Sequence, residues 1–242
     1  MLKKLLFCIF VMTSAIVFAQ SPVAGNCYSM DMDQKLYGCY VDFINDNDYY
    51  VEVTNQATDD IVYVVVLSYG KYKMHDNQLI LLDELLDYQL ILTYSNDTLY
   101  VQKGFEFMKD EYFVYSEKSS EKEIPVSNTL NKDSIQEERE NYNKDKQFDL
   151  QFGTYKSMRF VFYFSLNEDN TYSYSFRNCP LSNGTWERNG NVLSLYDPSL
   201  DCTYYLLVAN DNKLISKLLP GDNRSGSVFK MVNKSKPAQS WK

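Results

Sequence analysis

The stretch from Gly184 to Asp197 reads GTWERNGNVLSLYD, and the stretch from Gly70 to Asp83 reads GKYKMHDNQLILLD. Each begins with Gly-x-aromatic, passes through a polar turn containing Asn, and ends in an apolar run closed by Asp, which is the pattern of a β-hairpin. The two stretches lie at a constant offset of 114 residues. A constant offset indicates an internal duplication. The positions that define the repeat are Gly70, Tyr72, Leu79 and Leu81 in the first copy and Gly184, Trp186, Leu193 and Leu195 in the second.

Two further pairs of segments extend this duplication in the same order along the chain. Gly38-Cys39-Tyr40 matches Gly153-Thr154-Tyr155, and 96–99 matches 211–214, both at an offset of 115 residues. A degenerate hairpin pattern imitates part of such a match. The constant offset over several segments nevertheless favours a true duplication.

Both halves read as strands separated by turns. Phe160, Phe162 and Phe164 alternate with other residues, as do Tyr172 and Tyr174, and a period of two is typical of a half-buried strand. No intervening segment is long enough for a parallel crossover. The sequence therefore predicts an all-β protein with two tandem antiparallel meanders, each closed into a small lipocalin-like barrel without exposed edges. Eight strands are expected in each half, and those of the second half start near Phe152, Arg159, Thr171, Gly184, Val192, Thr203, Lys213 and Ser227.

One strand departs from the alternating pattern. Ile61–Leu67 is apolar without interruption, which is typical of a strand covered on both faces. We expect the second half or the N-terminal segment to cover it. An exposed patch for a partner is the alternative.

The chain divides into five predicted segments. Residues 1–19 have a basic start at Lys3 and Lys4, a short apolar run and a small residue at Ala19, as in a cleaved secretory signal peptide. The apolar run is shorter than the roughly 20 residues of a membrane span. We therefore expect an exported, periplasmic or extracellular protein without a membrane span after cleavage. The other segments are a first β domain (20–117), a polar linker (118–148), a second β domain (149–234) and a C-terminal tail (235–242).

Four cysteines remain beyond the predicted signal peptide. An even number in an exported chain favours disulfides over thiols. Two cysteines lie on each side of the linker, so the local pairs Cys27–Cys39 and Cys179–Cys202 are the favoured choice among three possible pairings. A zinc site is the alternative, but there is no Cys-x-x-Cys spacing.

Composition and charge restrict the possible partners. The chain has 24 basic and 32 acidic residues and a formal net charge of −8. An acidic surface disfavours nucleic acid and anionic membranes as partners. The single histidine, His75, makes a histidine-based metal centre improbable, and we expect neither a metal nor a cofactor.

The segment Ser182-Asn183-Gly184-Thr185-Trp186, followed by Asn191-x-Leu193-x-Leu195, resembles a motif of small secreted bacterial proteins with lipocalin-like barrels. The resemblance covers most of the second half and, more weakly, the first half, where Tyr72 stands in place of the tryptophan. It implies that Trp186 closes one end of a barrel and that the two leucines point inward. It implies an exported location and no particular ligand.

No known catalytic motif is present, although several residues are candidates for chemistry. Asp83 and Asp197 follow matched strands and suggest paired carboxylates, but aspartate is also the usual turn residue there. His75 is best explained as a turn residue. The cluster Asn45–Asp48 is the best calcium candidate, yet turn chemistry explains it better. Ser134 lies in a triplet that resembles a bacterial O-glycosylation acceptor.

Three functions remain open from the sequence. The first is an exported non-enzymatic binding protein whose barrel cavities or outer faces engage a small apolar molecule, a glycan or a protein. The second is an extracellular inhibitor or interaction protein that uses an acidic surface against a basic partner. The third is an enzyme with a carboxylate site around Asp83 or Asp197.

Overall fold

The computed structural model describes residues 21–31, 37–58, 61–119, 141–142, 147–158, 161–221 and 227–233. The predicted signal peptide, the predicted acceptor Ser134, the predicted tail and most of the predicted linker lie outside these ranges.

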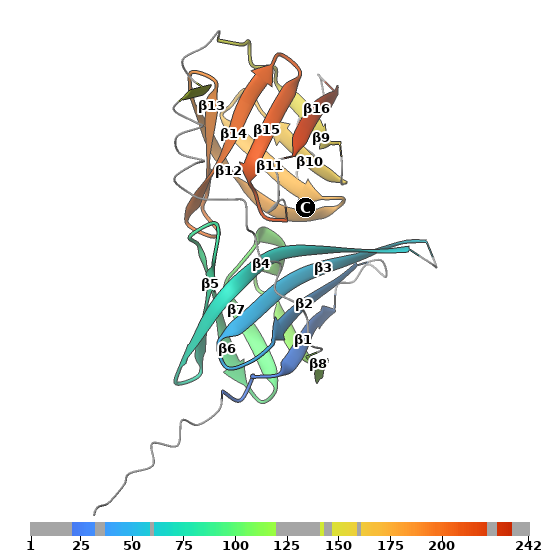
Figure 1. Ribbon diagram of the computed structural model, residues 1–242, viewed down its shortest axis with the longest axis vertical. Coiled ribbons are helices and arrows are strands. Elements are labelled where there is room, and N and C mark those ends of the chain that lie inside the picture. Colours follow the sequence, from blue (N-terminus) through green and yellow to red (C-terminus); the bar gives the residue numbers. More distant parts are fainter. Residues whose placement is uncertain are drawn as a thin grey trace, which may run out of the picture.

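The chain forms two closed antiparallel barrels of eight strands, which confirms the predicted fold class (Figure 1). In each barrel, every strand pairs with its neighbour in sequence, and the last strand pairs with the first. Barrel 1 consists of β1 (Asn26–Asp31), β2 (Tyr37–Phe43), β3 (Asp48–Thr58), β4 (Ile61–His75), β5 (Gln78–Asp83), β6 (Gln89–Ser95), β7 (Thr98–Lys103) and β8 (Tyr112–Lys118), with the 3₁₀ helix η1 (Glu106–Met108) between β7 and β8. Barrel 2 consists of β9 (Gly153–Ser157), β10 (Phe162–Leu166), β11 (Thr171–Phe176), β12 (Cys179–Asn189), β13 (Val192–Asp197), β14 (Cys202–Asn210), β15 (Lys213–Leu218) and β16 (Val228–Asn233).

The observed strands of barrel 2 begin close to the predicted starts, with one clear exception. Strand β12 begins at Cys179, five residues before the predicted start at Gly184. A tight turn at Arg177, which has φ of 51°, allows β11 to return at once. Pro180 is accommodated beside a register shift in the ladder between β11 and β12, where a missing N–H is tolerated.

Alternation along the strands places aromatic side chains inside the barrels. In barrel 2, Phe164 and Tyr172 stack with ring centroids 5.5 Å apart, and so do Phe162 and Tyr174. All four side chains are buried. Burying each such side chain contributes about 1.5–3 kcal/mol, so these rings are a main source of stability.

The continuous apolar run in β4 is covered from two directions. Val65 points inward and meets the turn at Gly221 of barrel 2. Val66 points outward and packs on a small outer cluster of Tyr50, Tyr69 and Leu85. The second half therefore covers the run at Val65 and the loop after β5 covers it at Val66, whereas Val64 is 54% exposed.

The two barrels repeat the same local hydrogen bonds. The Tyr72 N–H donates to the carbonyl of Asn47 at 2.8 Å, and the Trp186 N–H donates to that of Asn170 at 2.9 Å. Three other backbone hydrogen bonds at turns also have an equivalent in barrel 2. With the N–H donor given first, Ile44–Asp48 matches Asn167–Thr171, Tyr94–Asn77 matches Val208–Asn191, and Tyr115–Asp97 matches Met231–Asn212. The repeat of Gly70–Asp83 and Gly184–Asp197 is thus a repeat of structure. The predicted match of Gly38–Tyr40 with Gly153–Tyr155 is wrong, because these segments lie on β2 and β9, whereas the turn after β2 matches the turn after β10 at an offset of 123 residues.

The matched glycines hold a close approach between strands. A Cβ placed on Gly70 would lie 2.2 Å from the Leu82 carbonyl oxygen, and one placed on Gly184 would lie 1.9 Å from that of Tyr196. Both distances are far below normal contact, so the neighbouring strand approaches here only because no side chain is present.

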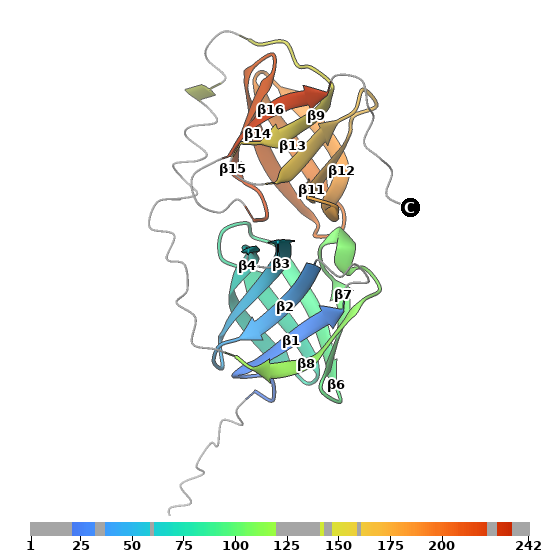
Figure 2. The same cartoon turned by 90° about the vertical axis from the view of Figure 1, so that its right-hand side faces the viewer.

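The barrels are stacked end to end (Figures 1 and 2). Each barrel has a facing end, at which β1, β3, β5 and β7 of barrel 1, or β9, β11, β13 and β15 of barrel 2, finish. The facing ends of the two barrels meet. The opposite, distal ends hold the points where the linker attaches. The Ser119 N–H donates to the Gly25 carbonyl at the distal end of barrel 1, and the Phe148 N–H donates to Asn191 Oδ1 at the distal end of barrel 2.

Replacing either glycine with alanine should destabilise the protein. We expect Gly70→Ala and Gly184→Ala each to lower the free energy of unfolding by at least about 2–3 kcal/mol, because a strand must shift to admit the methyl group. Urea denaturation measures the loss. Gly25→Ala is the control, because its Cβ would meet no atom within 4 Å. It should lower the free energy of unfolding by only about 1–2 kcal/mol, since alanine is strained at the φ of 70° found there. Equal losses at all three positions would contradict the close-approach explanation.

Candidate functional site

The interiors of both barrels are filled by side chains. The largest fully buried side chains are tyrosine and phenylalanine rings, and six of the twelve lie in each barrel. The distal ends are closed as well, by Val23 in barrel 1 and by Phe152 against Trp186 in barrel 2, with ring centroids 6.0 Å apart. The repeat leucines at 79, 81, 193 and 195 are buried in the same core.

Asp83 lies at the facing end of barrel 1 and is buried in a network of hydrogen bonds. Its Oδ1 accepts the backbone N–H groups of Leu85 at 2.9 Å and Leu86 at 2.7 Å. Its Oδ2 accepts the Ser68 hydroxyl at 2.8 Å, and that hydroxyl lies 2.7 Å from the Tyr49 hydroxyl. Burial raises the pKa of Asp83 above its usual value, and these hydrogen bonds oppose the shift.

Asp197 occupies the equivalent position in barrel 2. Its Oδ1 accepts the backbone N–H of Ser199 at 2.8 Å and of Leu200 at 3.3 Å, as Asp83 does at the matched positions. Its Oδ2 accepts the Tyr204 hydroxyl at 3.3 Å. The pair of Tyr49 and Ser68 also has its equivalent, with the hydroxyls of Tyr172 and Ser182 2.7 Å apart.

Both carboxylates therefore hold the loop that follows their strand. Both aspartates are buried, and their oxygens are engaged by backbone and hydroxyl donors. An arrangement of this kind satisfies the backbone of a tight loop. It supports a structural role for the two residues.

The two predicted disulfides are not formed. No disulfide is present among the described residues. In the β1–β2 ladder Cys27 is opposite Asp42 while Cys39 is opposite Met30. Three residues along a strand correspond to about 10 Å, more than the roughly 7 Å between Cα atoms that a disulfide spans.

The second predicted pair is separated still further. Cys202 lies opposite Asp197, at the level where β13 passes Gly184 of β12. Cys179 lies five residues before Gly184 along β12, and β13 separates β12 from the strand that carries Cys202. Local pairing was expected from sequence proximity, and the ladder registers exclude it.

The other candidates from the sequence are turn residues. His75 is exposed and lies 3.9 Å from the equally exposed Asp76. In the Asn45–Asp48 turn, the Asn45 side chain accepts two backbone N–H groups and donates to Asp48, whose other oxygen pairs with Lys71. In the described ranges, no group of three or more His, Cys, Asp or Glu side chains is arranged to hold a metal ion.

The most distinctive surface feature is a tyrosine patch on the outside of barrel 1, formed by Tyr100, Tyr112 and Val114. These side chains are 46%, 53% and 42% exposed. Tyr100 and Tyr112 are directly opposite each other on β7 and β8, with ring centroids 6.2 Å apart and ring planes at 39°. Their neighbours Leu99 and Phe113 point into the core, which forces the tyrosines outward.

Sequence reasoning did not single out this patch. Tyrosine is favoured in strands, which accounts for its abundance, and ten tyrosines of the described part of the chain are buried. The alternation of side chains along a strand could have predicted the patch. Tyr100 stands between Leu99 and Val101, so if Leu99 points into the barrel, Tyr100 points outside. The barrel 2 equivalents, Ile215 on β15 and Val228 on β16, are aliphatic and half-buried.

Comparison with known proteins found no matching family model and no similar curated protein. In the part of the chain that the structure describes, none of the helical residues forms an apolar helix long enough to cross a membrane.

The titration of Asp83 should be visible in the stability of the protein. Because burial raises its pKa in the fold, the folded state favours the protonated acid. Its contribution is therefore full below the unfolded pKa of about 3.9 and is lost as pH rises through the folded pKa. We expect the free energy of unfolding of Asp83→Asn, relative to wild type, to rise between pH 4 and pH 7 in urea titrations. Parallel curves for the two proteins would contradict this account.

The cysteines should behave as inert thiols. Burial raises the pKa of Cys179 and of Cys202 to about 12, and that of Cys39 well above its usual value. Since the thiolate is the reactive form, we expect these three to be alkylated by iodoacetamide at pH 8 more than about 100-fold more slowly than an exposed cysteine. Peptide mapping after brief labelling, and again after denaturation, measures this. A mass two hydrogens lower, indicating a disulfide, would contradict it.

Proposed function

We propose that this protein is an exported, non-enzymatic binding protein that engages its ligand on the outside of barrel 1, through the tyrosine patch. The observation that carries the proposal is the exposure of two neighbouring tyrosine rings on a sheet whose other face is packed core. Export is inferred from residues 1–19.

The ligand is inferred to bind on the surface because the barrels are filled. Lipocalin-like proteins with an internal ligand need a cavity in the barrel. Here aromatic rings occupy the interiors, the distal ends are closed by apolar side chains, and the facing ends close each other. A small apolar ligand inside either barrel is therefore disfavoured.

The size and chemistry of the patch favour a glycan chain. Three side chains supply far less than the roughly 800 Å² per partner of a stable protein interface. Two adjacent phenol rings instead offer flat apolar faces with hydroxyls at their edges, which suit the apolar faces and hydroxyls of successive sugar rings. Thr93, opposite Tyr100 on β6, adds a further hydroxyl beside the patch.

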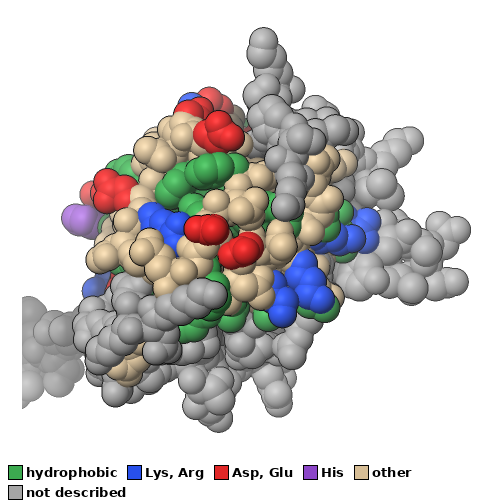
Figure 3. All heavy atoms as spheres, turned by 90° about the horizontal axis from the view of Figure 1, so that it is seen from above, with side chains coloured by type: hydrophobic (Ala, Val, Ile, Leu, Met, Phe, Trp, Pro, Cys, Tyr) green, Lys and Arg blue, Asp and Glu red, His purple; other side chains and the backbone are tan. Residues whose placement is uncertain are grey.

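The face shown in Figure 3 gives the electrostatic alternative no support. The end of the molecule shown in Figure 3 carries acidic and basic side chains interspersed with apolar ones. A surface that recognises a basic partner through charge needs a concentration of one sign.

The proposal is tested by affinity electrophoresis in native gels that contain soluble polysaccharides, after a glycan array has selected the best one. We expect Tyr100→Ala and Tyr112→Ala each to weaken binding about 3- to 10-fold, since an aromatic contact contributes about 0.5–1.5 kcal/mol. Retention of binding by Tyr100→Phe would show that the ring, and not the hydroxyl, is needed.

Tyr196→Ala is the matched control. Tyr196 is 44% exposed on barrel 2, and its hydroxyl donates to Asp201 at 2.9 Å. This variant should bind as the wild type does. Failure of every glycan to retard the wild-type protein, or equal weakening by all three alanine variants, would overturn the proposal.

A further inference from the structure

The contacts between the barrels are reciprocal. The β7–β8 loop of barrel 1, which carries η1, packs on β12 of barrel 2. The equivalent loop of barrel 2, between β15 and β16, carries Gly221, and a Cβ there would lie 2.9 Å from Val65 on β4. Strands β4 and β12 are equivalents in the repeat. Each barrel therefore presents the same loop to the same strand of the other.

A second pair of contacts has the same symmetry. Gly221 is held between Val65 of barrel 1 and Phe162 of barrel 2. The equivalent of Val65 is Cys179, at the offset of 114 residues. The equivalent of Phe162 is Cys39, because the turn after β2 and the turn after β10 match at an offset of 123 residues. Both cysteines are buried in the apolar cluster that the two barrels share, and the Cys179 thiol adds to the effect of burial in raising the pKa of Cys39.

A residue near a twofold axis meets its own equivalent. Tyr88 in the loop after β5 corresponds to Cys202 after β13, at the offset of 114 residues. Burial, Asp83 and Tyr49 raise the pKa of Tyr88, and Cys202 of the other barrel adds to the rise. Tyr88 and Cys202 both belong to, or pack against, the apolar cluster that the two barrels share.

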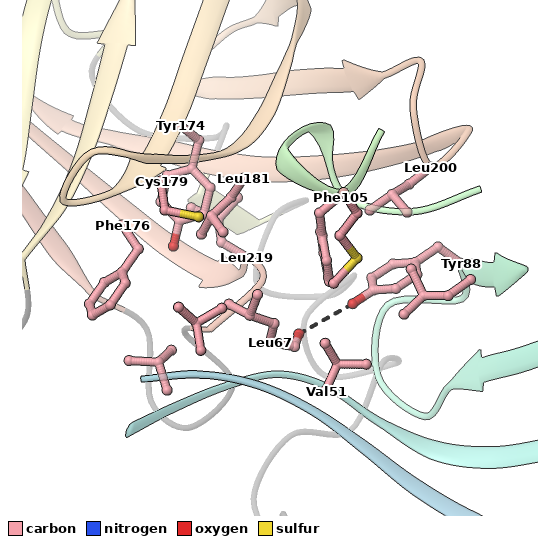
Figure 4. Packing of buried hydrophobic residues seen from close by; sticks show 14 of the residues in the cluster. Val51, Leu67, Tyr88, Phe105, Tyr174, Phe176, Cys179, Leu181, Leu200 and Leu219 are labelled. Atoms are coloured by element: carbon pink, nitrogen blue, oxygen red, sulfur yellow. Dashed lines mark hydrogen bonds between the residues drawn. The ribbon is translucent and has the colours of Figure 1, made fainter. Parts of the chain in front are cut away.

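The interface is apolar and continuous with both cores. Buried side chains of the two barrels belong to a single cluster. Figure 4 shows Val51, Leu67 and Tyr88 of barrel 1 lying against a layer that contains Leu181, Leu200 and Leu219 of barrel 2. Permanent interfaces have this character, since they resemble a core divided in two.

We propose that the facing end is a self-complementary docking surface, and that its partner outside this chain is the facing end of a second copy. A contact in which the same patch serves both sides is isologous, as in a homodimer with twofold symmetry. Within one chain the two facing ends pair because the linker keeps their effective concentration high. When the two barrels of one chain cannot reach each other, barrel 1 of each copy pairs with barrel 2 of the other copy. The result is a reciprocal dimer.

Linker length decides between the two pairings. The linker joins the two distal ends, so it must pass both barrels. Two stacked six-residue strands rise about 40 Å, or about 30 Å at the tilt of a small barrel. Deleting residues 121–144 leaves a connection from Ser119 to Gln147 that spans at most about 14 Å. Intrachain pairing then becomes impossible while both barrels remain intact.

The test is the mass in solution, measured by light scattering during gel filtration. We expect the deletion variant to be a dimer with twice the chain mass. A control in which residues 121–144 are replaced by a Gly/Ser segment of equal length should remain a monomer. A folded monomer in the deletion variant, with the circular dichroism of the parent, would overturn the proposal.

A second experiment does not depend on the folding of the deletion variant. A specific protease site is placed in the full-length linker, and the folded protein is cut. We expect the two barrels to stay together as one complex. In the cut protein, Val65→Asp should release the barrels, whereas Val64→Asp, on the neighbouring residue that is 54% exposed, should not. Cut barrels that separate without any substitution would contradict a self-complementary surface.

Discussion

The packing of aromatic rings inside each barrel is the constraint on which the rest of the structure depends. Rings at alternate strand positions fill the interiors, so the barrels close tightly and leave little space for a ligand. Excess apolar surface then remains at the ends. The distal ends are covered by each barrel's own N-terminal segment, and the facing ends cover each other. The stacking of the barrels therefore follows from how their interiors are filled.

The fold was accessible from the sequence because its signals are local. The hairpin at Gly184–Asp197, its copy at Gly70–Asp83 and the alternating aromatic runs each report the period of a strand and the position of a turn. The repeat added long-range information, since two copies of one unit must share one topology. The start of β12 was missed because a tight turn at Arg177 has no Gly and is followed by Pro180.

The candidate site was less accessible, for physical reasons. Cysteine pairing depends on ladder register, and neither proximity in sequence nor an even count reports that Cys39 lies opposite Met30, three residues along β1 from Cys27. The tyrosine patch depends on which face of β7 and β8 is outside, and a strand of apolar residues on both faces conceals this. The two aspartates were found at matched strand ends, but only the structure shows that their oxygens hold the following loops.

The positions of Ser21 and Asn233 have a mechanical consequence. Ser21 and Asn233 lie at opposite distal ends of the stack. Tension applied between these points acts along the long axis and loads the apolar junction first, because the barrels themselves are closed by hydrogen-bonded ladders. The number of residues between Ser119 and Gln147 then sets how far the two barrels can separate. The junction is therefore the first contact expected to yield when the molecule is pulled.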